Sequence, residues 1–596
     1  MPTLASNRGN SFVRACLWPA VFALISGIGC QGIHARLKKP ATACHCAAIT
    51  PCSDPESAAQ ALESTLRADA DAAVLVPLAE RCLQAGCQPC AGLERVRDAA
   101  VYSGFALATG GDSALESRAV AVHNAAVERL IRASQCRCPT TSWPSVFLDL
   151  GIEVWGNHPL EPERLCDIHM ACDYDVKGFH CHFRSDGVGV PLVPLRPNDT
   201  KCPIVTMDRF YPGQDQHRPP ATAVLQPSGT PADWRSHRQR LALYDPYACG
   251  QVCFGERRYP LASDRTTPLA VQVRHSNVIR VGLQGVFRPE VLVEQAGIYM
   301  LQPYRPGKIP IVFVHGLAGH PSSFVQTINK LQNDCELSPH YQLWFYLYPT
   351  GEPMTSSAAR LKRALRDAIE TLDPAGADPA LRNMVVVAHS QGGVVAKLLI
   401  QCSGDEMWNA LFAVPIEELK ASPEVKDHLA EELFYEPEPY VGRMIFMAAP
   451  HGGTKLALKI LPRLAELRIR KHEVLTQEIK GIVRDNGRSV LAPGVLLRRI
   501  NGVANMAPNN PMLAAARRAP LADDIPYHNI MFRLPDKRRP TDGMVLLPNA
   551  YIEGAVTEVI VPGDHRSEDK PEAYAELLKL LRLHLAESRC GGSRCR

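Results

Sequence analysis

The sequence predicts an α/β fold for the second half of the chain, in which a mostly parallel sheet is flanked by helices. Three observations support this prediction. Apolar runs of strand length recur there, amphipathic helical segments stand between them, and one run passes through a small-residue turn straight into a helix. Strands that alternate with helices are typical of a parallel sheet whose faces are covered by the helices.

Six apolar runs are the predicted strands of this sheet. The run over 341–348 (YQLWFYLY) is aromatic and aliphatic apart from Gln342, which is expected of a strand buried on both faces. The segment over 358–372 has the spacing of an amphipathic helix. The other five runs are 311–314, the run that begins at 384, 441–449, 527–534 and 556–561.

The run over 384–400, MVVVAHSQGGVVAKLLI, has the layout of a nucleophile elbow. A serine hydroxyl attacks a carbonyl where a base takes its proton and backbone N–H groups stabilise the oxyanion, and a sharp strand-to-helix turn offers both. Gly392 and Gly393 follow Ser390, and Ala388 stands where the usual G-x-S-x-G pattern has glycine. The pattern predicts Ser390 as the nucleophile; the alternative is a surface hydroxyl that caps a helix.

The predicted strand over 311–314 ends in a glycine-containing loop, HGLAG at 315–319. A glycine such as Gly316 lets backbone N–H groups face a substrate, and an oxyanion hole combines such a loop with the residue after the nucleophile. We therefore expect the N–H groups of Leu317 and Gln391 to be the oxyanion donors. An ordinary turn after a strand is the alternative.

A nucleophilic serine needs a histidine base and a carboxylate that orients the histidine. In a sheet of this kind both follow the serine along the chain, the acid first. Asp542, shortly after the strand over 527–534, fits the acid, and His565, directly after the strand over 556–561, fits the base. The rivals are Asp536 for the acid and His389, His451 and His528 for the base.

With these segments in place, residues 297–586 resemble α/β-hydrolase fold lipases and esterases, most closely bacterial lipase-like hydrolases. The resemblance covers roughly half of the chain, and its departures, Ala388 and Met544, remove no catalytic group. It implies hydrolysis of a carboxylic ester through an acyl-enzyme on Ser390, and no metal or other cofactor is expected. The segments that carry it are HGLAG at 315–319, AHSQGG at 388–393, APHGGT at 449–454, TDGMV at 541–545 and GDH at 563–565.

The composition is that of an ordinary globular protein, since 46% of the residues are hydrophobic and 21% are charged. At 596 residues the chain is too long for a single domain by the usual prior. The 65 basic and 61 acidic residues nearly balance, at a net charge of +4, so nucleic acid is not an expected partner. The expected partner is an ester or lipid substrate.

The N-terminus has the composition of an export signal. Two arginines precede an apolar stretch over 15–29 that is too short to span a membrane as a stable helix. The residues up to Cys30 resemble a lipobox, in which the cysteine is lipidated after cleavage, except that Gly27 stands where leucine is usual. We expect a signal peptide over 1–29 and an exported protein, periplasmic or anchored to the envelope membrane by a lipid on Cys30. Cleavage near Ala35 and a retained anchor are the alternatives.

The chain has 20 cysteines, and most of them precede residue 260. Disulfides persist outside the cytoplasm, so this usage agrees with export and favours disulfides, although the spacing gives no pairing. Zinc is the alternative, but the cysteines lack a paired C-x-x-C arrangement. The thiolates that could serve it are Cys82, Cys87, Cys90, Cys136 and Cys138.

Two regions precede the predicted sheet. Residues 30–138 contain Ala-rich segments with helical spacing, which predict antiparallel helices. Residues 139–296 are richer in Pro and Gly and contain short runs such as LAVQVRH and VIRVGLQGVF, which we interpret as strands of a small β-containing region. The α/β part then spans 297–588, and 589–596 form a tail.

Two insertions, over 401–440 and 455–526, separate the predicted core strands and contain amphipathic stretches. They would lie over the strand ends where Ser390 sits, so we interpret them as a lid or an acyl-binding cap. Surface decoration is the alternative.

The sequence thus predicts a serine hydrolase of carboxylic esters with Ser390, Asp542 and His565 as its catalytic triad. One alternative is another acyl chemistry on the same residues: acyl transfer, phospholipid deacylation, or cleavage of a thioester or amide. The other is a non-catalytic envelope protein, in which the N-terminal regions bind a partner and the α/β part is a scaffold.

Overall fold

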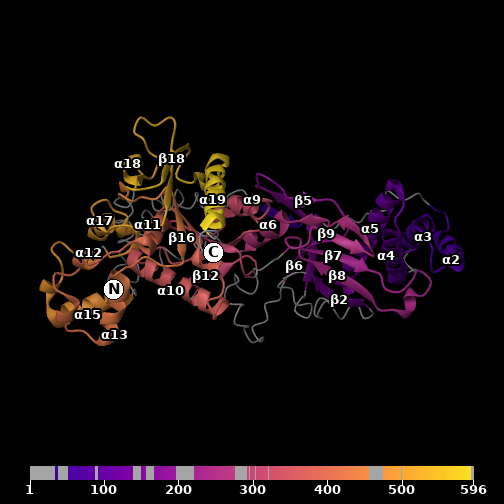
Figure 1. Cartoon of the computed structure of the whole chain (residues 1–596), viewed down its shortest axis with the longest axis horizontal. Coiled ribbons are helices and arrows are strands. Elements are labelled where there is room, and N and C mark those ends of the chain that lie inside the picture. The colour runs from indigo at the N-terminus through magenta and orange to yellow at the C-terminus, as the bar shows by residue number, and fades with distance from the viewer. Residues whose placement is uncertain are drawn as a thin grey trace, which may run out of the picture.

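The computed structural model shows an elongated molecule, with an α/β part at one end and a bundle of helices at the other (Figure 1). A second, smaller sheet lies between them. The structure describes residues 34–37, 52–86, 92–137, 150–155, 167–195, 220–275, 292–293, 295–302, 304–319, 321–455, 474–497 and 500–591.

A seven-stranded sheet forms the centre of the C-terminal part, in the order β12-β14-β13-β15-β16-β17-β18. β12 runs antiparallel to β14, and the other neighbouring strands are parallel. The six predicted strands are all present, so the prediction of a mostly parallel sheet is confirmed. The strands are β12 (Gly297–Met300), β13 (Ile309–Val314), β14 (Tyr341–Leu347), β15 (Met384–His389), β16 (Val441–Met447), β17 (Tyr527–Arg533) and β18 (Thr557–Pro562).

Both faces of this sheet are covered by helices, which is why its central strands are apolar throughout. Ile311 and Phe313 of β13 pack with α9 (Val325–Leu331) and α19 (Pro571–Gly591) on one face. The alternate residues, Val312 and Val314, pack with α10 and α11 (Gln391–Lys397) on the other. α19 runs to Gly591, past residue 588, where the α/β part was predicted to end.

Helix α10 (Met354–Leu372) begins earlier than the predicted start at 358. Pro353 precedes its first residue, and the first turn (MTSS) is polar rather than amphipathic, so the apolar spacing did not reveal it. This turn is buried, and the second insertion lies against it: Met354 N donates a hydrogen bond to Asn505 Oδ1 (2.8 Å).

The order in which the strands are added to the sheet changes side at β13. From β13 the chain moves to β14 on one side, and β15 then lies on the other side of β13. The loops that follow β13 and β15 therefore diverge at the carboxyl ends of neighbouring strands. Open α/β sheets bind their ligands at such a switch point. The loop over 315–319 and Ser390 both follow directly at this place.

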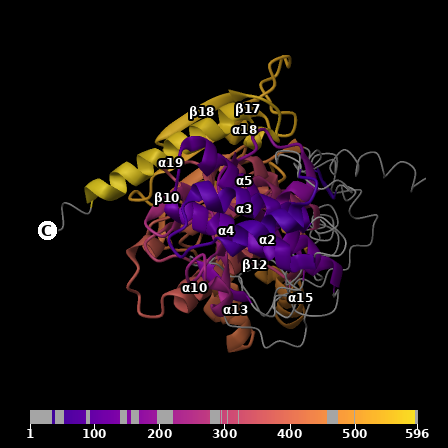
Figure 2. The ribbon, with the colours of Figure 1, turned by 90° about the vertical axis from the view of Figure 1, so that its right-hand side faces the viewer.

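The predicted helices of the N-terminal region are confirmed, and they face the viewer in Figure 2. Their apolar side chains form one core with a five-stranded sheet of order β2-β8-β7-β6-β3. The helices are α2 (Pro55–Ser64), α3 (Ala72–Ala85), α4 (Gly92–Thr109) and α5 (Ser113–Arg137). The strands are β2 (Leu150–Trp155), β3 (Asp167–Met170), β6 (Val190–Leu195), β7 (Ala221–Gln226) and β8 (Gln239–Tyr244).

The interpretation of LAVQVRH as a strand is wrong, because this run belongs to helix α6 (Thr266–His275). A short apolar run does not distinguish a strand from a buried helix by its periodicity. The signals for the helix lie before the run: Asp264 Oδ1 accepts a hydrogen bond from Thr267 N (2.8 Å), and Pro268 stands in the first turn. The run VIRVGLQGVF lies outside the described residues.

The described cysteines do not support the expected disulfides. Cys52, Cys82, Cys181, Cys249 and Cys253 are free thiols. The expected lipidation site, Cys30, lies outside the described residues, as do Cys44, Cys46, Cys87, Cys90, Cys138, Cys166 and Cys202. Within the part of the chain that the structure describes, none of the helices is both long enough and apolar enough to cross a membrane.

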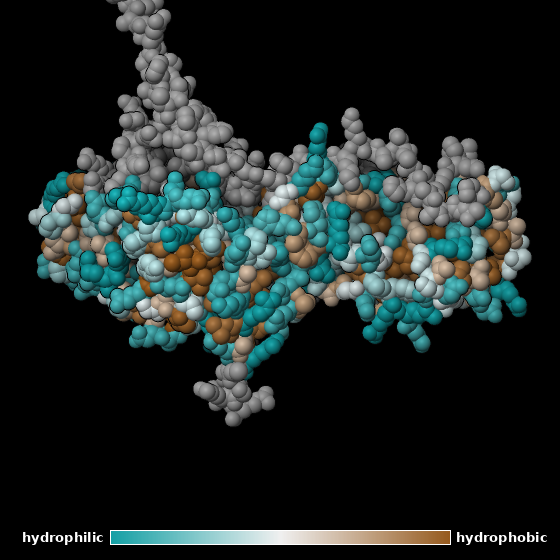
Figure 3. Space-filling model, turned by 90° about the horizontal axis from the view of Figure 1, so that it is seen from above, coloured by the Kyte–Doolittle hydropathy of each residue, from teal (hydrophilic) through white to brown (hydrophobic). Residues whose placement is uncertain are grey.

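The surface of the C-terminal part carries apolar patches among hydrophilic areas (Figure 3). Large apolar side chains that are exposed on or beside the edge strand β18 include Tyr551, Val556 and Ile560. Glu558 lies within this strand and Pro562 is its last residue. A charge and a proline both hinder the pairing of an edge strand with a further strand.

Several histidines are buried in the neutral form. Burial lowers the pKa of His123, in the N-terminal helices, to about 4. At the edge of the large sheet opposite Ser390, burial and the Arg443 charge lower the pKa of His584 and of His528 to about 4. Arg443 also contacts Glu587, so this buried cluster ties α19 to β16 and β17.

We expect the buried histidines His123 and His584 to contribute a loss of stability as the pH falls from about 6.5 to about 4. In this window an unfolded histidine is protonated whereas His123 and His584 stay neutral, so the unfolded state binds more protons and is favoured. Each such residue should cost roughly 1 to 3 kcal/mol at the acidic end. The urea midpoint of His123→Phe, relative to that of the unsubstituted protein, should rise between pH 7 and pH 4.5, because this variant lacks the histidine contribution. A difference between the two midpoints that does not change with pH would contradict this.

Candidate active site

Ser390 occupies the turn between β15 and α11 in a backbone conformation that L-residues rarely adopt, with φ 54° and ψ −125°. The turn is fixed on both sides. The strand before it is completely buried, and Ser390 N donates a hydrogen bond to the carbonyl oxygen of Met447 at the end of β16 (2.9 Å). The serine side chain therefore stands at the carboxyl edge of the sheet.

The predicted glycines lie where no side chain fits. A Cβ atom at Gly392 would lie 2.5 Å from the carbonyl oxygen of His315, and one at Gly393 would lie 2.5 Å from Ala449 Cβ. A Cβ atom at Gly316 would lie 2.9 Å from Ser390 Cβ. Glycine at these positions lets α11 pack against the ends of β13 and β16 and lets the loop over 315–319 contact the serine.

Ser390, His565 and Asp542 form a continuous chain of hydrogen bonds. Ser390 Oγ lies 2.7 Å from His565 Nε2, and His565 Nδ1 lies 2.6 Å from Asp542 Oδ2. All three residues are buried. When Nδ1–H donates to the carboxylate, Nε2 carries the lone pair that accepts the serine proton. The structure thus brings the three predicted residues together in the geometry that a nucleophile, a base and an orienting acid require.

Asp542 is held in place by its own loop. Its Oδ1 accepts hydrogen bonds from the N–H groups of Met544 (2.8 Å) and Val545 (2.6 Å), which leaves Oδ2 for His565. The carbonyl oxygen of Asp542 also accepts a hydrogen bond from His565 N (2.9 Å). Met544, a departure from the family pattern, acts here through its backbone, so its side chain does not affect the contact.

The rival residues lie elsewhere or have other partners. Asp536 is exposed. His389 Nε2 hydrogen-bonds the carbonyl oxygen of His565 (2.8 Å), and His528 contacts Arg443 at the opposite edge of the sheet. His451 is buried, and neither of its ring nitrogens has a hydrogen-bond partner among the described residues.

The predicted oxyanion donors are not used elsewhere among the described residues. The N–H groups of Leu317 and Gln391 donate no hydrogen bond to any described residue, and Gln391 is the first residue of α11, where the helix macrodipole favours negative charge. The loop over 315–319 is fixed, because Ala318 N donates to Thr350 Oγ1 (3.1 Å) and Tyr348 Oη donates to the carbonyl oxygen of His315 (2.8 Å).

Backbone strain is concentrated around Ser390. Among the described residues, the non-glycine residues with positive φ are Ala318, Ser390 and Ala448. Ser390 and Ala448 directly follow β15 and β16, and Ala318 lies in the loop that follows β13, so all three are at the carboxyl edge of the large sheet. Such conformations cost of order 1 to 3 kcal/mol each and cluster at functional sites. The packing around these loops therefore offsets this cost in free energy and holds them in place.

Two buried titratable groups, His389 and Glu568, lie near His565. Burial, together with the His565 charge, lowers the pKa of His389 to about 3, and burial raises the pKa of Glu568 well above its usual range. Glu568 Oε2 lies 3.6 Å from His389 Nε2. Burial thus disfavours the charged forms of both groups, and Asp542 is the carboxylate that contacts the His565 ring and can stabilise its protonated form.

Part of the second insertion lies beside the elbow. Gly502 N, at the start of α16 (Gly502–Asn505), donates a hydrogen bond to the carbonyl oxygen of Gly351 (2.9 Å). A Cβ atom at Gly502 would lie 2.8 Å from Gln391 Nε2. This segment therefore covers the carboxyl end of β14, whereas residues 456–473 lie outside the described residues. A lid or cap function stays a prediction.

The two insertions are joined by an ion pair. His428, on α13 (Pro423–Leu433), contacts Glu478, on α15 (Val474–Asn486), at 2.7 Å. Glu432 and Glu478 raise the pKa of His428 to about 9, so this histidine is charged at neutral pH.

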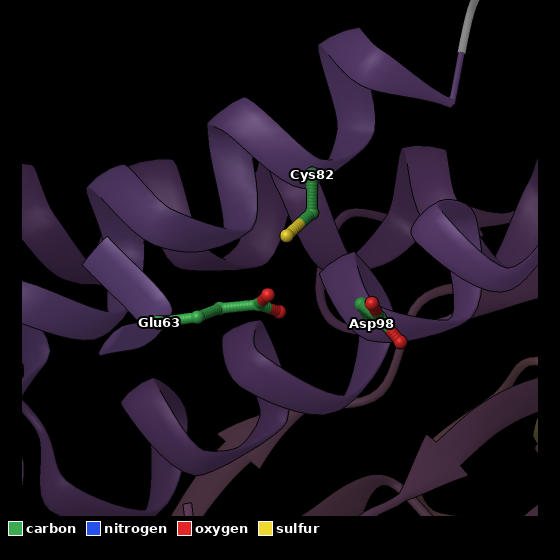
Figure 4. Close-up of side chains that lie close together, drawn as sticks. All are labelled: Glu63, Cys82 and Asp98. Atoms are coloured by element: carbon green, nitrogen blue, oxygen red, sulfur yellow. The ribbon is translucent and has the colours of Figure 1, made fainter. Parts of the chain in front are cut away.

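Glu63, Cys82 and Asp98 come together between the N-terminal helices (Figure 4). Their oxygen and sulfur atoms lie within 4.8 Å of one another. Both carboxylates, however, are already paired: Arg95 Nη1 lies 3.0 Å from Glu63 and 3.2 Å from Asp98, and Arg235 Nη2 lies 3.1 Å and 2.9 Å from them. Burial also raises the pKa of the Cys82 thiol. These residues form a buried ion-pair network that repels a further cation.

Two contributors to the site were not predicted, Thr350 and Asp569. Thr350 fixes the oxyanion loop and follows the end of β14 almost directly, so its place at a strand end was the available signal. Asp569 accepts hydrogen bonds from the start of α9, which is more than 200 residues away in the sequence. No local pattern indicates such a contact.

Residues 311–577 match the sequence profile of the Alpha/beta hydrolase family. No curated protein matches the chain. Solved structures similar to it include the mature lipase BlEst2 of Bacillus licheniformis, with 19% identity, covering 48% of this chain and 97% of that one at a TM-score of 0.28. The Staphylococcus hyicus lipase has 15% identity, 48% and 99% coverage and a TM-score of 0.29. Lipase 1 from Pelosinus fermentans has 14% identity, 47% and 98% coverage and a TM-score of 0.28. Scores this low do not bear on function.

Proposed function

We propose that this protein is a serine hydrolase that cleaves carboxylic esters, since residues 311–577 match the profile of the Alpha/beta hydrolase family. The observation that carries the proposal is the continuous chain of hydrogen bonds from Ser390 Oγ through His565 to Asp542. A serine that only caps a helix needs no such chain, and Ser390 makes no side-chain cap bond to α11.

In the first half of the proposed reaction, Ser390 Oγ attacks the ester carbonyl carbon while His565 Nε2 takes the hydroxyl proton. Asp542 stabilises the imidazolium that forms, and it keeps the proton on Nδ1 throughout. The N–H groups of Leu317 and Gln391 donate hydrogen bonds to the developing oxyanion. Collapse of the tetrahedral intermediate expels the alcohol, which takes its proton from His565, and leaves the acyl group on Ser390.

In the second half, water enters where the alcohol left. His565 Nε2 takes a proton from this water, its oxygen attacks the acyl carbon, and the same two N–H groups stabilise the second oxyanion. Collapse returns the proton to Ser390 and releases the carboxylic acid. An alcohol in place of water would give acyl transfer, so acceptor selectivity separates a hydrolase from a transferase.

The test is labelling with a fluorophosphonate, combined with turnover of esters of graded acyl length, with and without micelles. We expect label on the peptide that contains Ser390 and release of free acid even when an alcohol acceptor competes. Label without release of acid from any ester would favour the thioester, amide or transfer alternatives. Neither label nor turnover would overturn the proposal and favour a non-catalytic scaffold.

A further inference from the structure

One face of helix α9 is lined by side-chain amides. Gln326 and Asn329 lie on α9, and Gln332 and Asn333 directly follow its last residue, Leu331; the first three of these side chains are buried. A buried amide must find hydrogen-bond partners, since leaving it unpaired costs about 1 to 3 kcal/mol. On α9 these partners come from the N-terminal part of the chain, which meets α9 near α6 (Figure 1).

The first two amides bind the loop over 178–183. Gln326 Nε2 donates to the carbonyl oxygen of Gly178 (2.7 Å), and Gln326 Oε1 accepts from His180 N (3.1 Å). Asn329 Nδ2 donates to the carbonyl oxygen of Cys181 (2.8 Å), and Asn329 Oδ1 accepts from Thr266 Oγ1 at the start of α6 (3.0 Å). Both amides therefore use their donor and their acceptor on the N-terminal part.

The other contacts extend this interface along α9 and beyond it. Tyr247 Oη donates to Gln332 Oε1 (3.0 Å), and Arg265 Nη1 donates to Asn333 Oδ1 (3.3 Å). Arg305, shortly before β13, forms an ion pair with Asp245 (2.5 Å) in which both side chains are largely buried. The N-terminal part is thus docked on α9 through directional polar contacts that fix the orientation of the helix.

The start of α9 is held from the other side by the loop that carries His565. Asp569 Oδ2 accepts from Gln326 N (3.1 Å), and Asp569 Oδ1 accepts from Thr327 N (3.0 Å) and Thr327 Oγ1 (2.8 Å). A carboxylate that accepts amide hydrogen bonds in the first turn caps a helix and is favoured by its macrodipole. The cap comes from a residue four positions after His565.

Helix α9 therefore stands between three segments. It follows the oxyanion loop through the turn η6 (Pro321–Phe324), it binds the loop of His565 through Asp569, and it carries the N-terminal part on its amide face. A displacement of α9 would move the oxyanion donors and His565 relative to Ser390. Misplacement by about 1 Å can cost on the order of 100-fold in rate.

We propose that the N-terminal part is a scaffold for the active site, and that Asp569 is the positioning residue through which α9 holds the loop of His565. This inference rests on the proposed function. Asp569 touches none of the reacting atoms; it acts through the backbone between residues 565 and 569. The amides Gln326 and Asn329 extend the same support to the loop over 178–183.

The first test is Asp569→Asn in the full-length chain. Asparagine retains one acceptor oxygen but places an NH₂ group against the N–H of Gln326 or Thr327, so the cap is lost. We expect kcat to fall about 10- to 100-fold with KM nearly unchanged. The rate of fluorophosphonate labelling should fall in proportion, and the low-field proton resonance of the His565–Asp542 hydrogen bond should shift or broaden.

The matched control is Asp373→Asn. Asp373 also accepts two backbone hydrogen bonds, from Ala377 N (2.9 Å) and Asp378 N (2.7 Å), but it lies before the start of β15, at the opposite edge of the sheet. This variant should lose a similar amount of thermal stability and keep kcat. If both variants lower kcat equally, or if Asp569→Asn leaves kcat and the resonance unchanged, Asp569 has no positioning role.

The second test weakens the interface with isosteric changes. Gln326→Glu with Asn329→Asp replaces two donors by carboxylate oxygens that repel the carbonyl groups of Gly178 and Cys181. We expect kcat to fall, and the effect to be less than additive with Asp569→Asn because both act through α9. The control is Asn124→Asp on α5, which makes the same exchange against the carbonyl oxygen of Gly187 (2.8 Å) within the N-terminal part and not on α9; it should retain activity.

Full kcat in the doubly substituted protein, or additive effects, would overturn the scaffold proposal. If the double variant does not fold, Asp569→Asn and its control decide the question. Failure of the proposed function would look different, because the unsubstituted protein would then show neither label on Ser390 nor ester turnover.

Discussion

Replacing Ser390 by alanine is expected to abolish ester hydrolysis, lowering kcat by at least about 10⁴-fold. The substitution removes the hydroxyl that donates to His565 Nε2 and leaves the rest of the site intact. Among the described residues, Ser390 is the side chain that contacts His565 Nε2; the predicted oxyanion donors are backbone groups, and His389 hydrogen-bonds the carbonyl oxygen of His565.

The fold should survive this change. Alanine retains the Cβ atom that packs against Gly316, and the strained backbone at φ 54° is imposed by β15 and α11 rather than by the hydroxyl. The control is Ser357→Ala, since the buried hydroxyl of Ser357 has no hydrogen-bond partner among the described residues and lies on α10. Circular dichroism and melting should match the parent protein for both variants. Turnover retained by Ser390→Ala would show that Ser390 is not the nucleophile.

The strands of the large sheet could be predicted because of where they lie. A strand covered by helices on both faces has no polar side, so 341–348 appears in the sequence as a run of aromatic and aliphatic residues with Gln342 as its one polar member. The run over 269–275 shows the limit of this reasoning. Its Leu, Ala and Val residues also suggested a strand, but Asp264 and Pro268 begin a helix before it, and a pattern of apolar residues does not contain that information.

The site could be predicted in part, for a related reason. Ser390 and His565 each directly follow a strand, and parallel strands carry their carboxyl ends to one edge, so strand order alone brings the two residues near each other. The supports of these residues could not be predicted. Thr350, Glu568 and Asp569 become part of the site through contacts between segments far apart in the sequence, and such contacts depend on the packing of whole helices.

The same distinction applies to the N-terminal part. Its helices were visible as Ala-rich amphipathic segments, but their relation to the active site was not. The amides on α9 are ordinary helix-surface residues by sequence, and their burial follows only when the loop over 178–183 and α6 are docked on them. A role for residues before 297 in the activity is therefore a question that the three-dimensional arrangement raises.

Asp542→Asn is expected to lower kcat by about 10⁴-fold, whereas Asp536→Asn should change it by less than about threefold. The reason lies in how the Asp542 carboxylate is used. Oδ1 accepts from the N–H groups of Met544 and Val545, so an asparagine keeps its oxygen there and turns its NH₂ group toward His565 Nδ1. The imidazole must then accept at Nδ1 and carry its proton on Nε2, where it cannot take the proton of Ser390.

Steady-state kinetics with one ester, together with the rate of fluorophosphonate labelling, check this prediction. Both should fall in Asp542→Asn while KM stays nearly constant, because the tautomer affects proton transfer and not the binding of the ester. Asp536 is exposed, so its substitution controls for the loss of one negative charge in the same segment of the chain. If Asp536→Asn were the variant that lost activity, the loop over 541–545 would be a structural turn, and the orienting acid would reach His565 only after a rearrangement of that segment. Equal, small effects of both substitutions would mean that the loop, through the hydrogen bond from His565 N to the carbonyl oxygen of Asp542, orients the imidazole without the carboxylate.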